Sequence, residues 1–158
     1  MIKFVLLLLC CTAFSCRTTY YIVRHAEKET AATMMADVPL SERGKQQALA
    51  LENSLQDKNI KQIFSTRYSR TLATAQPLST ATGIRIDTYN AADMGFVTRL
   101  KKLKNNVLIV GHSNTVDDLV NALMRKTVLQ DLPDSAYGDL FIVTKKSGNY
   151  LFQKNRYE

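Results

Sequence analysis

The chain has 158 residues, of which 46% are hydrophobic and 22% are charged. This length and composition predict one globular domain with a buried core, and they argue against an intrinsically disordered chain. The formal net charge of +7 favours anionic partners such as phosphate esters, nucleic acid or anionic lipid, without choosing among them.

The first sixteen residues, MIKFVLLLLCCTAFSC, are predicted to be a signal peptide rather than part of the domain. A lysine near the start precedes a short apolar run, and small residues then lead to Cys16. This order is typical of secretory signals, and the apolar run is too short to span a bilayer comfortably. Residues 17–158 are therefore expected to form the single folded domain.

The position of Cys16 after Ala-Phe-Ser resembles a bacterial lipoprotein signal, in which the cysteine becomes the lipidated first residue of the mature chain. The other cysteines, Cys10 and Cys11, also precede the domain, so an internal disulfide is not expected. The alternative is a plain cleaved signal in which Cys16 is incidental. We expect an exported protein of the bacterial cell envelope, anchored to a membrane by lipid and facing the periplasm or the exterior.

Strands and helices are predicted to alternate along the rest of the chain. Strands are expected over residues 20–23, 60–64, 84–86, 107–110, 140–144 and 150–153, the last two as an antiparallel pair. Helices are expected from an N-cap at Ser41 to about residue 58, and over residues 68–82, 91–104 and 114–126. Gly83 suits the end of the second helix because glycine accepts positive φ.

This alternation predicts an α/β fold with a mostly parallel central sheet. The continuous apolar run VLIV at residues 107–110 is typical of a strand that is buried on both faces. In such sheets the ligand site lies beyond the carboxyl ends of the strands. Side chains that directly follow a strand are therefore the first candidates for function.

Histidines and arginines follow three of the predicted strands. Arg24 and His25 follow the first, Arg67 and Arg70 follow the second, and His112 follows the run VLIV-Gly. A lone histidine is more often structural, but here both histidines of the chain lie at equivalent strand ends. Guanidinium groups match phosphate oxygens with paired hydrogen bonds, so the sequence predicts an electropositive pocket for a phosphoryl group.

Histidine in such a pocket suits nucleophilic catalysis. Nearby positive charge keeps the imidazole neutral, and a neutral imidazole is a competent nucleophile. Phosphoryl transfer also needs positive charge around the equatorial oxygens, which arginines provide without a metal. The domain has no cysteine, its two histidines lack a short ligand spacing, and no glycine-rich phosphate loop occurs, so neither a metal nor a cofactor is expected.

Four segments together resemble the histidine phosphatase superfamily, also called phosphoglycerate mutase-like. They are IVRHAEK, PLSERGKQQA, FSTRYSRTLATAQPL and VLIVGHSNT, and they occur in the family's order over nearly the whole domain. The resemblance implies a three-layer α/β/α fold. It places the key arginine at Arg70, which leaves Arg67 as a solvent-facing residue. The chain departs from the family pattern at Ala26, which replaces the common glycine, and at Thr71, which replaces the usual alanine.

The resemblance also implies roles for individual residues. His25 would be the nucleophile that becomes phosphohistidine, and Arg24, Arg70 and His112 would hold the phosphoryl oxygens. Asn114 lies where a helix opens, so backbone N–H groups there could add a contact to the anion, although capping is their first function.

The proton donor for the leaving group stays open. The family's usual donor is a Glu or Asp in the middle of the chain. Asp93 is the preferred candidate because it follows the third strand by the length of a loop, and Glu27 and Asp87 are the alternatives. Each of the three is as readily a surface carboxylate. Family members without the acid would favour substrates with good leaving groups.

The resemblance implies a metal-independent phosphatase that acts on a phosphorylated small molecule or a phosphoprotein. The short domain favours a compact phosphatase over a mutase, because family mutases carry insertions that enclose a sugar phosphate. The alternative is a module that binds phosphorylated ligands with little turnover. Nucleic-acid binding is not expected, because basic and aromatic residues are not interleaved.

Overall fold

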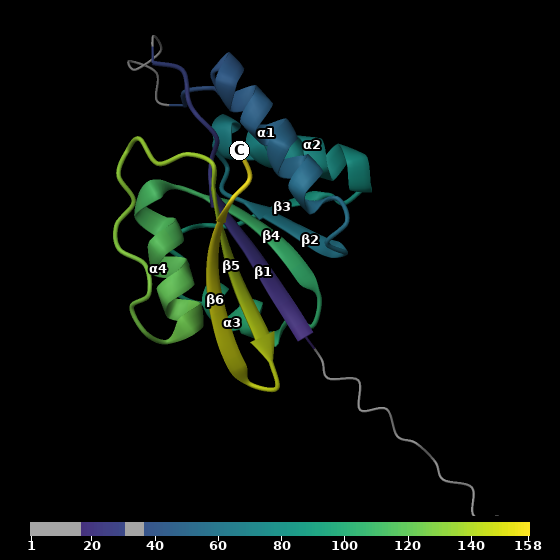
Figure 1. Cartoon of the computed structure of the whole chain (residues 1–158), viewed down its shortest axis with the longest axis vertical. Helices are drawn as coiled ribbons and strands as arrows, with labels where there is room; N and C mark the ends of the chain where they lie inside the picture. The colour runs from purple at the N-terminus through teal and green to yellow at the C-terminus, as the bar shows by residue number, and fades with distance from the viewer. Residues whose placement is uncertain (1–16, 31–36) are drawn as a thin grey trace, which may run out of the picture.

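The computed structural model describes residues 17–30 and 37–158, which form one six-stranded sheet with helices on both faces (Figure 1). The strands are β1 (Arg17–Arg24), β2 (Ile60–Ser65), β3 (Ile86–Thr88), β4 (Asn106–Gly111), β5 (Asp139–Lys146) and β6 (Asn149–Arg156). Their order across the sheet is β3-β2-β4-β1-β5-β6. The first four strands in this order pair in parallel, and β5 is antiparallel to both β1 and β6.

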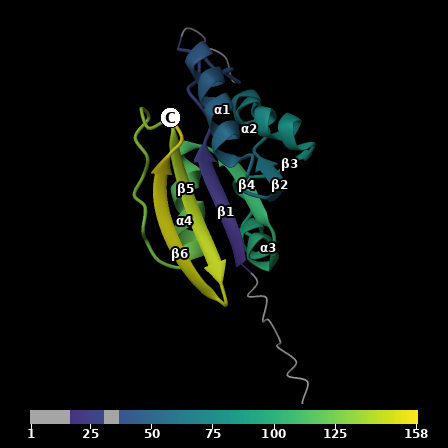
Figure 2. The ribbon, with the colours of Figure 1, turned by 45° about the vertical axis from the view of Figure 1, so that its right-hand side comes forward.

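Four helices cover the sheet in two layers. They are α1 (Glu42–Leu55), α2 (Ser69–Thr82), α3 (Phe96–Lys102) and α4 (Ser113–Met124). Helices α1 and α2 lie together against one face, and α3 and α4 pack against the other (Figure 2). The prediction of a three-layer α/β/α fold with a mostly parallel central sheet is therefore confirmed.

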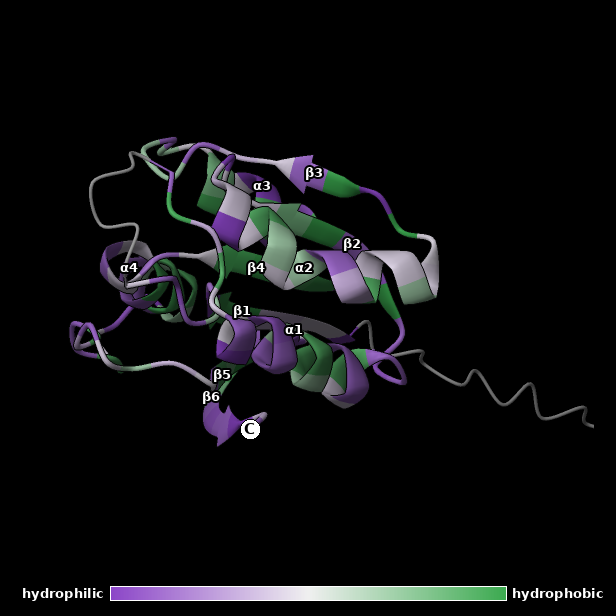
Figure 3. Cartoon of the chain, turned by 90° about the horizontal axis from the view of Figure 1, so that it is seen from above, coloured by the Kyte–Doolittle hydropathy of each residue, from purple (hydrophilic) through white to green (hydrophobic). Residues whose placement is uncertain are grey.

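The two helical layers explain the sequence of β1. Its side chains alternate between the faces: Tyr20 and Ile22 pack with α3 and α4, while Tyr21 and Val23 pack with α1 and α2. Since both faces are covered, residues 20–23 are all apolar or aromatic, and the same holds for residues 107–110 of β4 (Figure 3). The ends of these two buried strands are consequently held at fixed positions in the fold.

The predicted helix ends are partly confirmed. Ser41 caps α1 by accepting a hydrogen bond from the Gly44 N–H at 3.0 Å, and Gly83 ends α2 with φ of 70°. Helix α3 is shorter than the predicted 91–104, because residues 90–95 form turns in which Asn90 and Asp93 side chains accept backbone hydrogen bonds.

Several strand ends also differ from the predictions. Strand β1 begins at Arg17 rather than at residue 20, because its first residues pair with the end of β5. Strand β3 lies two residues later than the predicted 84–86, where it pairs with the end of β2. These pairings depend on distant partners, which local patterns do not contain.

The predicted signal peptide and lipidated Cys16 lie outside the described residues. Within residues 17–30 and 37–158, no helix has the length and apolar character needed to cross a membrane.

Candidate active site

A pocket of about 810 Å³ opens at the carboxyl edge of the parallel strands. It is lined by residues that follow β1, β2, β3 and β4, together with Asp134 from the connection between α4 and β5. Arg24, His25, Arg70 and His112, which are distant in sequence, all line it, and so does Asn114. The structure therefore brings together the residues that were predicted to bind and attack a phosphoryl group.

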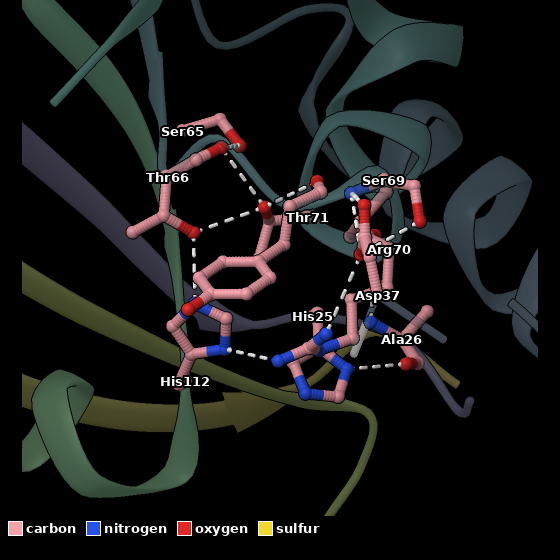
Figure 4. Close-up of polar contacts among 11 residues, drawn as sticks. His25, Ala26, Asp37, Ser65, Thr66, Ser69, Arg70, Thr71 and His112 are labelled. Atoms are coloured by element: carbon pink, nitrogen blue, oxygen red, sulfur yellow. Dashed lines mark hydrogen bonds and ion pairs between the residues drawn. The ribbon is translucent and has the colours of Figure 1, made fainter. Parts of the chain in front are cut away.

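The backbone of β1 places His25 deep in this pocket, where only 4% of the residue is exposed. Its own N–H donates to the Gly111 carbonyl of β4 at 2.9 Å. The ring Nδ1 lies 2.7 Å from the Ala26 carbonyl (Figure 4). Because a carbonyl only accepts, Nδ1 carries the proton and Nε2 keeps its lone pair.

The electrostatic surroundings keep His25 neutral. Burial lowers its pKa to about 3, and the positive charges of Arg24 and Arg70 and the nearby His112 act in the same direction, against the hydrogen bond to Ala26. A neutral ring with the lone pair on Nε2 is the form that can act as a nucleophile.

The guanidinium of Arg24 contacts the loop between α4 and β5 through Nη1, while its Nε is buried without a partner in the described part of the chain. Its Nη1 donates to the carbonyls of Pro133, Asp134 and Ala136 at 3.1, 2.9 and 3.3 Å, and its guanidinium lies 4.3 Å from the centre of the Tyr137 ring. The guanidinium therefore holds the loop between α4 and β5 at the edge of the pocket. Its Nε is buried and has no hydrogen-bond partner among the described residues.

Arg70 lies in the first turn of α2 and is positioned from three sides. Its Nη1 is 3.6 Å from the Asp37 carboxylate, its Nη2 is 3.4 Å from His112 Nδ1, and its guanidinium lies 4.5 Å from the centre of the Tyr68 ring. Asp37 is itself held by the backbone and hydroxyl of Ser69. The Nε of Arg70, like that of Arg24, is buried without a partner in the described part of the chain.

The two Nε–H groups are buried donors without an acceptor in the described part of the chain. A buried donor without an acceptor costs about 1–3 kcal/mol, more for a charged group, and native proteins seldom leave one unsatisfied. Both donors belong to residues that line the same pocket as His25. An anion in the pocket would balance the positive charges of the two guanidinium groups.

His112 follows β4 and is half-buried beside His25. The centres of its ring and the His25 ring are 5.5 Å apart, and Tyr68 packs edge-on against it at 4.9 Å. Burial, together with the positive charges of Arg70 and Arg24, lowers the pKa of His112 to about 4. The site therefore contains two neutral imidazoles between two arginines.

The carboxylates predicted as proton donors lie outside the pocket lining. Asp93 is 2.6 Å from Arg99 and accepts from the Gly95 N–H, and the bond to Arg99 is the main reason that its pKa is lowered. Asp87 pairs with Arg85 at 2.8 Å. The hydrogen bonds of Asp93 therefore favour its ionised form, and both side chains are engaged by local charge partners.

Glu27 follows His25 by two residues, and its side chain contacts the start of α1. Its side chain accepts from the Ser41 hydroxyl at 2.9 Å. Its backbone lies so close to Gly44 that a Cβ there would be 2.0 Å from the Glu27 carbonyl oxygen. Glu27 and the start of α1 thus support the loop after β1. The carboxylate that does line the pocket is Asp134, whose side chain is fully exposed 3.8 Å from Arg24.

The rim contains residues that the sequence analysis did not single out. Lys28, Tyr68, Tyr89 and Asn90 line the pocket around the buried centre. The exposed Arg67 also reaches the rim, where its Nε donates to the Thr88 hydroxyl at 3.3 Å. Their positions after strand ends were a usable signal for Tyr68 and Asn90. No local pattern points to Asp37 or Asp134, which arrive through tertiary packing.

Sheet order, layering and the position of the pocket define a phosphoglycerate mutase-like α/β fold. The protein histidine phosphatase SixA, complexed with tungstate, is similar with a TM-score of 0.71 and 19% identity over 88% of this chain and 97% of that one. A mycobacterial glucosyl-3-phosphoglycerate phosphatase is similar with a TM-score of 0.67 and 15% identity, over 89% of this chain and 98% of that one. A phosphoserine phosphatase mutant from Entamoeba histolytica, in complex with phosphoserine, is similar with a TM-score of 0.68 and 14% identity, over 89% of this chain and 98% of that one. At these identities the likeness shows the fold.

The sequence itself points to the same group of proteins. Residues 20–92 match the model of the histidine phosphatase superfamily (branch 1). The matched stretch includes Arg24, His25 and Arg70 and ends before His112. The match covers less than half of the chain, and the similarity to the solved structures shows the fold. No curated protein matches the chain significantly.

The lowered pKa values predict how stability depends on pH. Histidine in an unfolded chain has a pKa near 6.5, whereas His25 and His112 in the folded chain have pKa values of about 3 and about 4. Below pH 6.5 the unfolded state binds more protons, so the free energy of unfolding should fall as the pH decreases from 6.5 towards 4. Urea unfolding at pH 7.5 and pH 5 measures this, and His25→Gln should show a weaker pH dependence. An NMR titration in which His25 protonates near pH 6.5 would contradict the account.

Proposed function

We propose that the protein is a histidine phosphatase that hydrolyses phosphate monoesters through a phosphohistidine intermediate on His25, without a metal ion. One observation carries this proposal: the lone pair of His25 Nε2 shares a pocket with the two buried, unpaired arginine Nε donors. The match of residues 20–92 to the superfamily model supports it independently.

Binding uses the two arginines. A phosphoryl dianion in the pocket would accept hydrogen bonds from the Nε–H groups of Arg24 and Arg70 through its non-bridging oxygens. These hydrogen bonds would be charge-assisted, and they would form in a site already largely shielded from water. The loop contacts of Arg24 and the Asp37 contact of Arg70 fix both guanidinium groups before the ligand arrives.

The first chemical step is attack by His25. Its Nε2 forms a bond to phosphorus while the phosphorus–oxygen bond to the leaving group breaks, and the leaving oxygen departs as an anion or takes a proton from water. The arginines stabilise charge on the equatorial oxygens, which is the main contribution a protein makes to phosphoryl transfer. In the second step water attacks the phosphohistidine, the nitrogen–phosphorus bond breaks, and inorganic phosphate is released with a proton.

In this scheme the guanidinium groups supply the positive charge that metal ions supply in other phosphoryl-transfer sites. Among the described residues, no group of three or more His, Cys, Asp or Glu side chains is arranged to hold a metal. The proposed substrate is a phosphorylated small molecule or phosphoprotein. The proposed location at the cell envelope, with lipid on Cys16, depends on residues 1–16 alone and is tested by membrane fractionation of Cys16→Ser.

The central residues are tested by steady-state hydrolysis of an aryl phosphate in excess EDTA. We expect His25→Ala to lower kcat about 1000-fold or more, because the nucleophile is lost. Arg70→Ala should lower kcat/KM about 100-fold, because one charged donor to the phosphoryl group is lost. Arg85→Ala is the matched control, since Arg85 is exposed and forms an ion pair with Asp87 outside the pocket lining, and it should keep wild-type activity. Full activity of His25→Ala would refute the mechanism. Loss of wild-type activity in EDTA would also refute it.

The placement of the carboxylates predicts a strong preference for good leaving groups. With Asp93, Glu27 and Asp87 outside the pocket, departure of the leaving oxygen should not depend on them. A series of aryl phosphates should therefore show rates that rise steeply as the pKa of the leaving phenol falls, and Asp93→Asn should keep the same slope as the wild type.

Two results would change this picture. A shallow slope in the wild type that becomes steep in Asp93→Asn would identify Asp93 as the proton donor. Tight vanadate binding that is lost in Arg70→Ala, without turnover of any substrate in the series, would favour the alternative of a module that binds phosphorylated ligands.

A further inference from the structure

A departure from the family's sequence pattern, Thr71, belongs to a buried chain of hydroxyl groups that ends on His112 (Figure 4). Thr71 lies in the first turn of α2 and is fully buried. Its Oγ1 is 2.8 Å from the Tyr68 carbonyl and 3.0 Å from the Thr66 carbonyl. The same atom is 3.0 Å from the Thr66 hydroxyl, which in turn lies 2.9 Å from His112 Nε2.

The chemistry of these groups gives the chain a direction. Carbonyl oxygens only accept, so the single hydroxyl proton of Thr71 points to one of its two carbonyl partners. The Thr71 oxygen can then accept a hydrogen bond, and the Thr66 hydroxyl donates its proton to it. The Thr66 oxygen must therefore accept from His112, which places a proton on Nε2.

The other side of the ring leads to the same assignment. His112 Nδ1 faces Nη2 of Arg70 at 3.4 Å. A guanidinium only donates, so the nitrogen facing it carries a lone pair. The neutral His112 ring thus holds its proton on Nε2 and its lone pair on Nδ1, the opposite of His25, whose proton on Nδ1 is fixed by the Ala26 carbonyl.

We propose that Thr71 is a positioning residue that acts through Thr66 to fix His112 with its proton on Nε2 and its Nδ1 lone pair beside Arg70. Thr71 touches neither His112 nor the space that a substrate would occupy. It sets the state of His112 by ordering the hydroxyl between them. An alanine, which the family usually has at this position, cannot do so.

This arrangement has a consequence that rests on the proposed phosphatase function. Neutral His112 offers a phosphoryl oxygen only a lone pair at Nδ1, so holding a dianion there requires a proton on Nδ1. The ring faces Arg24 and His25 from the end of β1, and Tyr68 and Arg70 from the start of α2. A bound dianion offsets the two arginine charges, and the complex should contain one proton more than the free protein and the dianion.

The first test measures the tautomer directly and needs no substrate. Long-range proton–nitrogen NMR correlations of the imidazole rings at pH 7 should show His112 protonated on Nε2 in the wild type. Thr71→Val keeps the shape but removes the hydroxyl, and a fraction of His112 should then be protonated on Nδ1. Thr71→Ser keeps the hydroxyl and should match the wild type. An unchanged tautomer in folded Thr71→Val, or Nδ1 protonation in the wild type, would overturn the proposal.

The second test measures the consequence for the site. Thr71→Val should change how kcat/KM for an aryl phosphate depends on pH between 5 and 8, because a ring protonated on Nδ1 can donate to the dianion without taking up a further proton. Thr71→Ser should keep the wild-type pH dependence. Thr82→Val is the matched control, because Thr82 makes the same kind of bond to a carbonyl, 2.6 Å from Leu78 O, in the last turn of α2.

The two tests separate the inference from the proposed function. If the NMR result holds while the wild type hydrolyses no phosphate ester, the phosphatase function fails and the role of Thr71 stands. If hydrolysis holds while Thr71→Val and Thr71→Ser lose activity equally, the hydroxyl has no special role and the inference fails. If Thr71→Val does not fold, Thr71→Ala removes the same hydroxyl, and an unchanged His112 tautomer in folded Thr71→Ala overturns the proposal.

Discussion

The parallel pairing of β1 with β4 is the constraint on which the site depends. In their register Arg24 lies beside Gly111, so the next residue of each strand is a histidine, and the His25 N–H donates to the Gly111 carbonyl. Strand β2 pairs with β4 on the other side, which brings the residues after Ser65 to the same edge. A shift of this register by one residue would separate the two histidines and turn their neighbours to the opposite face.

Electrostatics explains why this cluster can be both buried and reactive. Two guanidinium groups and two imidazoles line one pocket. The lowered pKa values keep both imidazoles neutral, so they add no positive charge beside the arginines. The buried Nε–H groups, which have no partner in the described part of the chain, are a local cost that the proposed phosphoryl ligand would remove. Fixed hydrogen bonds, from His25 to Ala26 and from His112 to Thr66, give the two rings different tautomers and so different roles.

The sequence predicted the fold and the site best where a residue of the pocket directly follows a strand with a clear apolar pattern. The apolar runs of β1 and β4 predicted buried parallel strands, and the residues directly after them lie in the pocket. It was least informative where long-range packing decides, as in the contact of Arg24 with residues 133–136 and of Arg70 with Asp37. Loop length alone made Asp93 a natural candidate for the proton donor, but hydrogen bonds to Gly95 and Arg99 hold its side chain outside the pocket lining.

The most direct test of the central claim is to trap the phosphorylated protein during turnover. A rapid quench in base, followed by mass spectrometry of the peptides, should find one phosphoryl group on His25, stable in base and lost in acid. The same experiment on His25→Ala should find none. Steady hydrolysis by the wild type without a phosphohistidine, or an acid-stable phosphoryl group on another residue, would contradict the account.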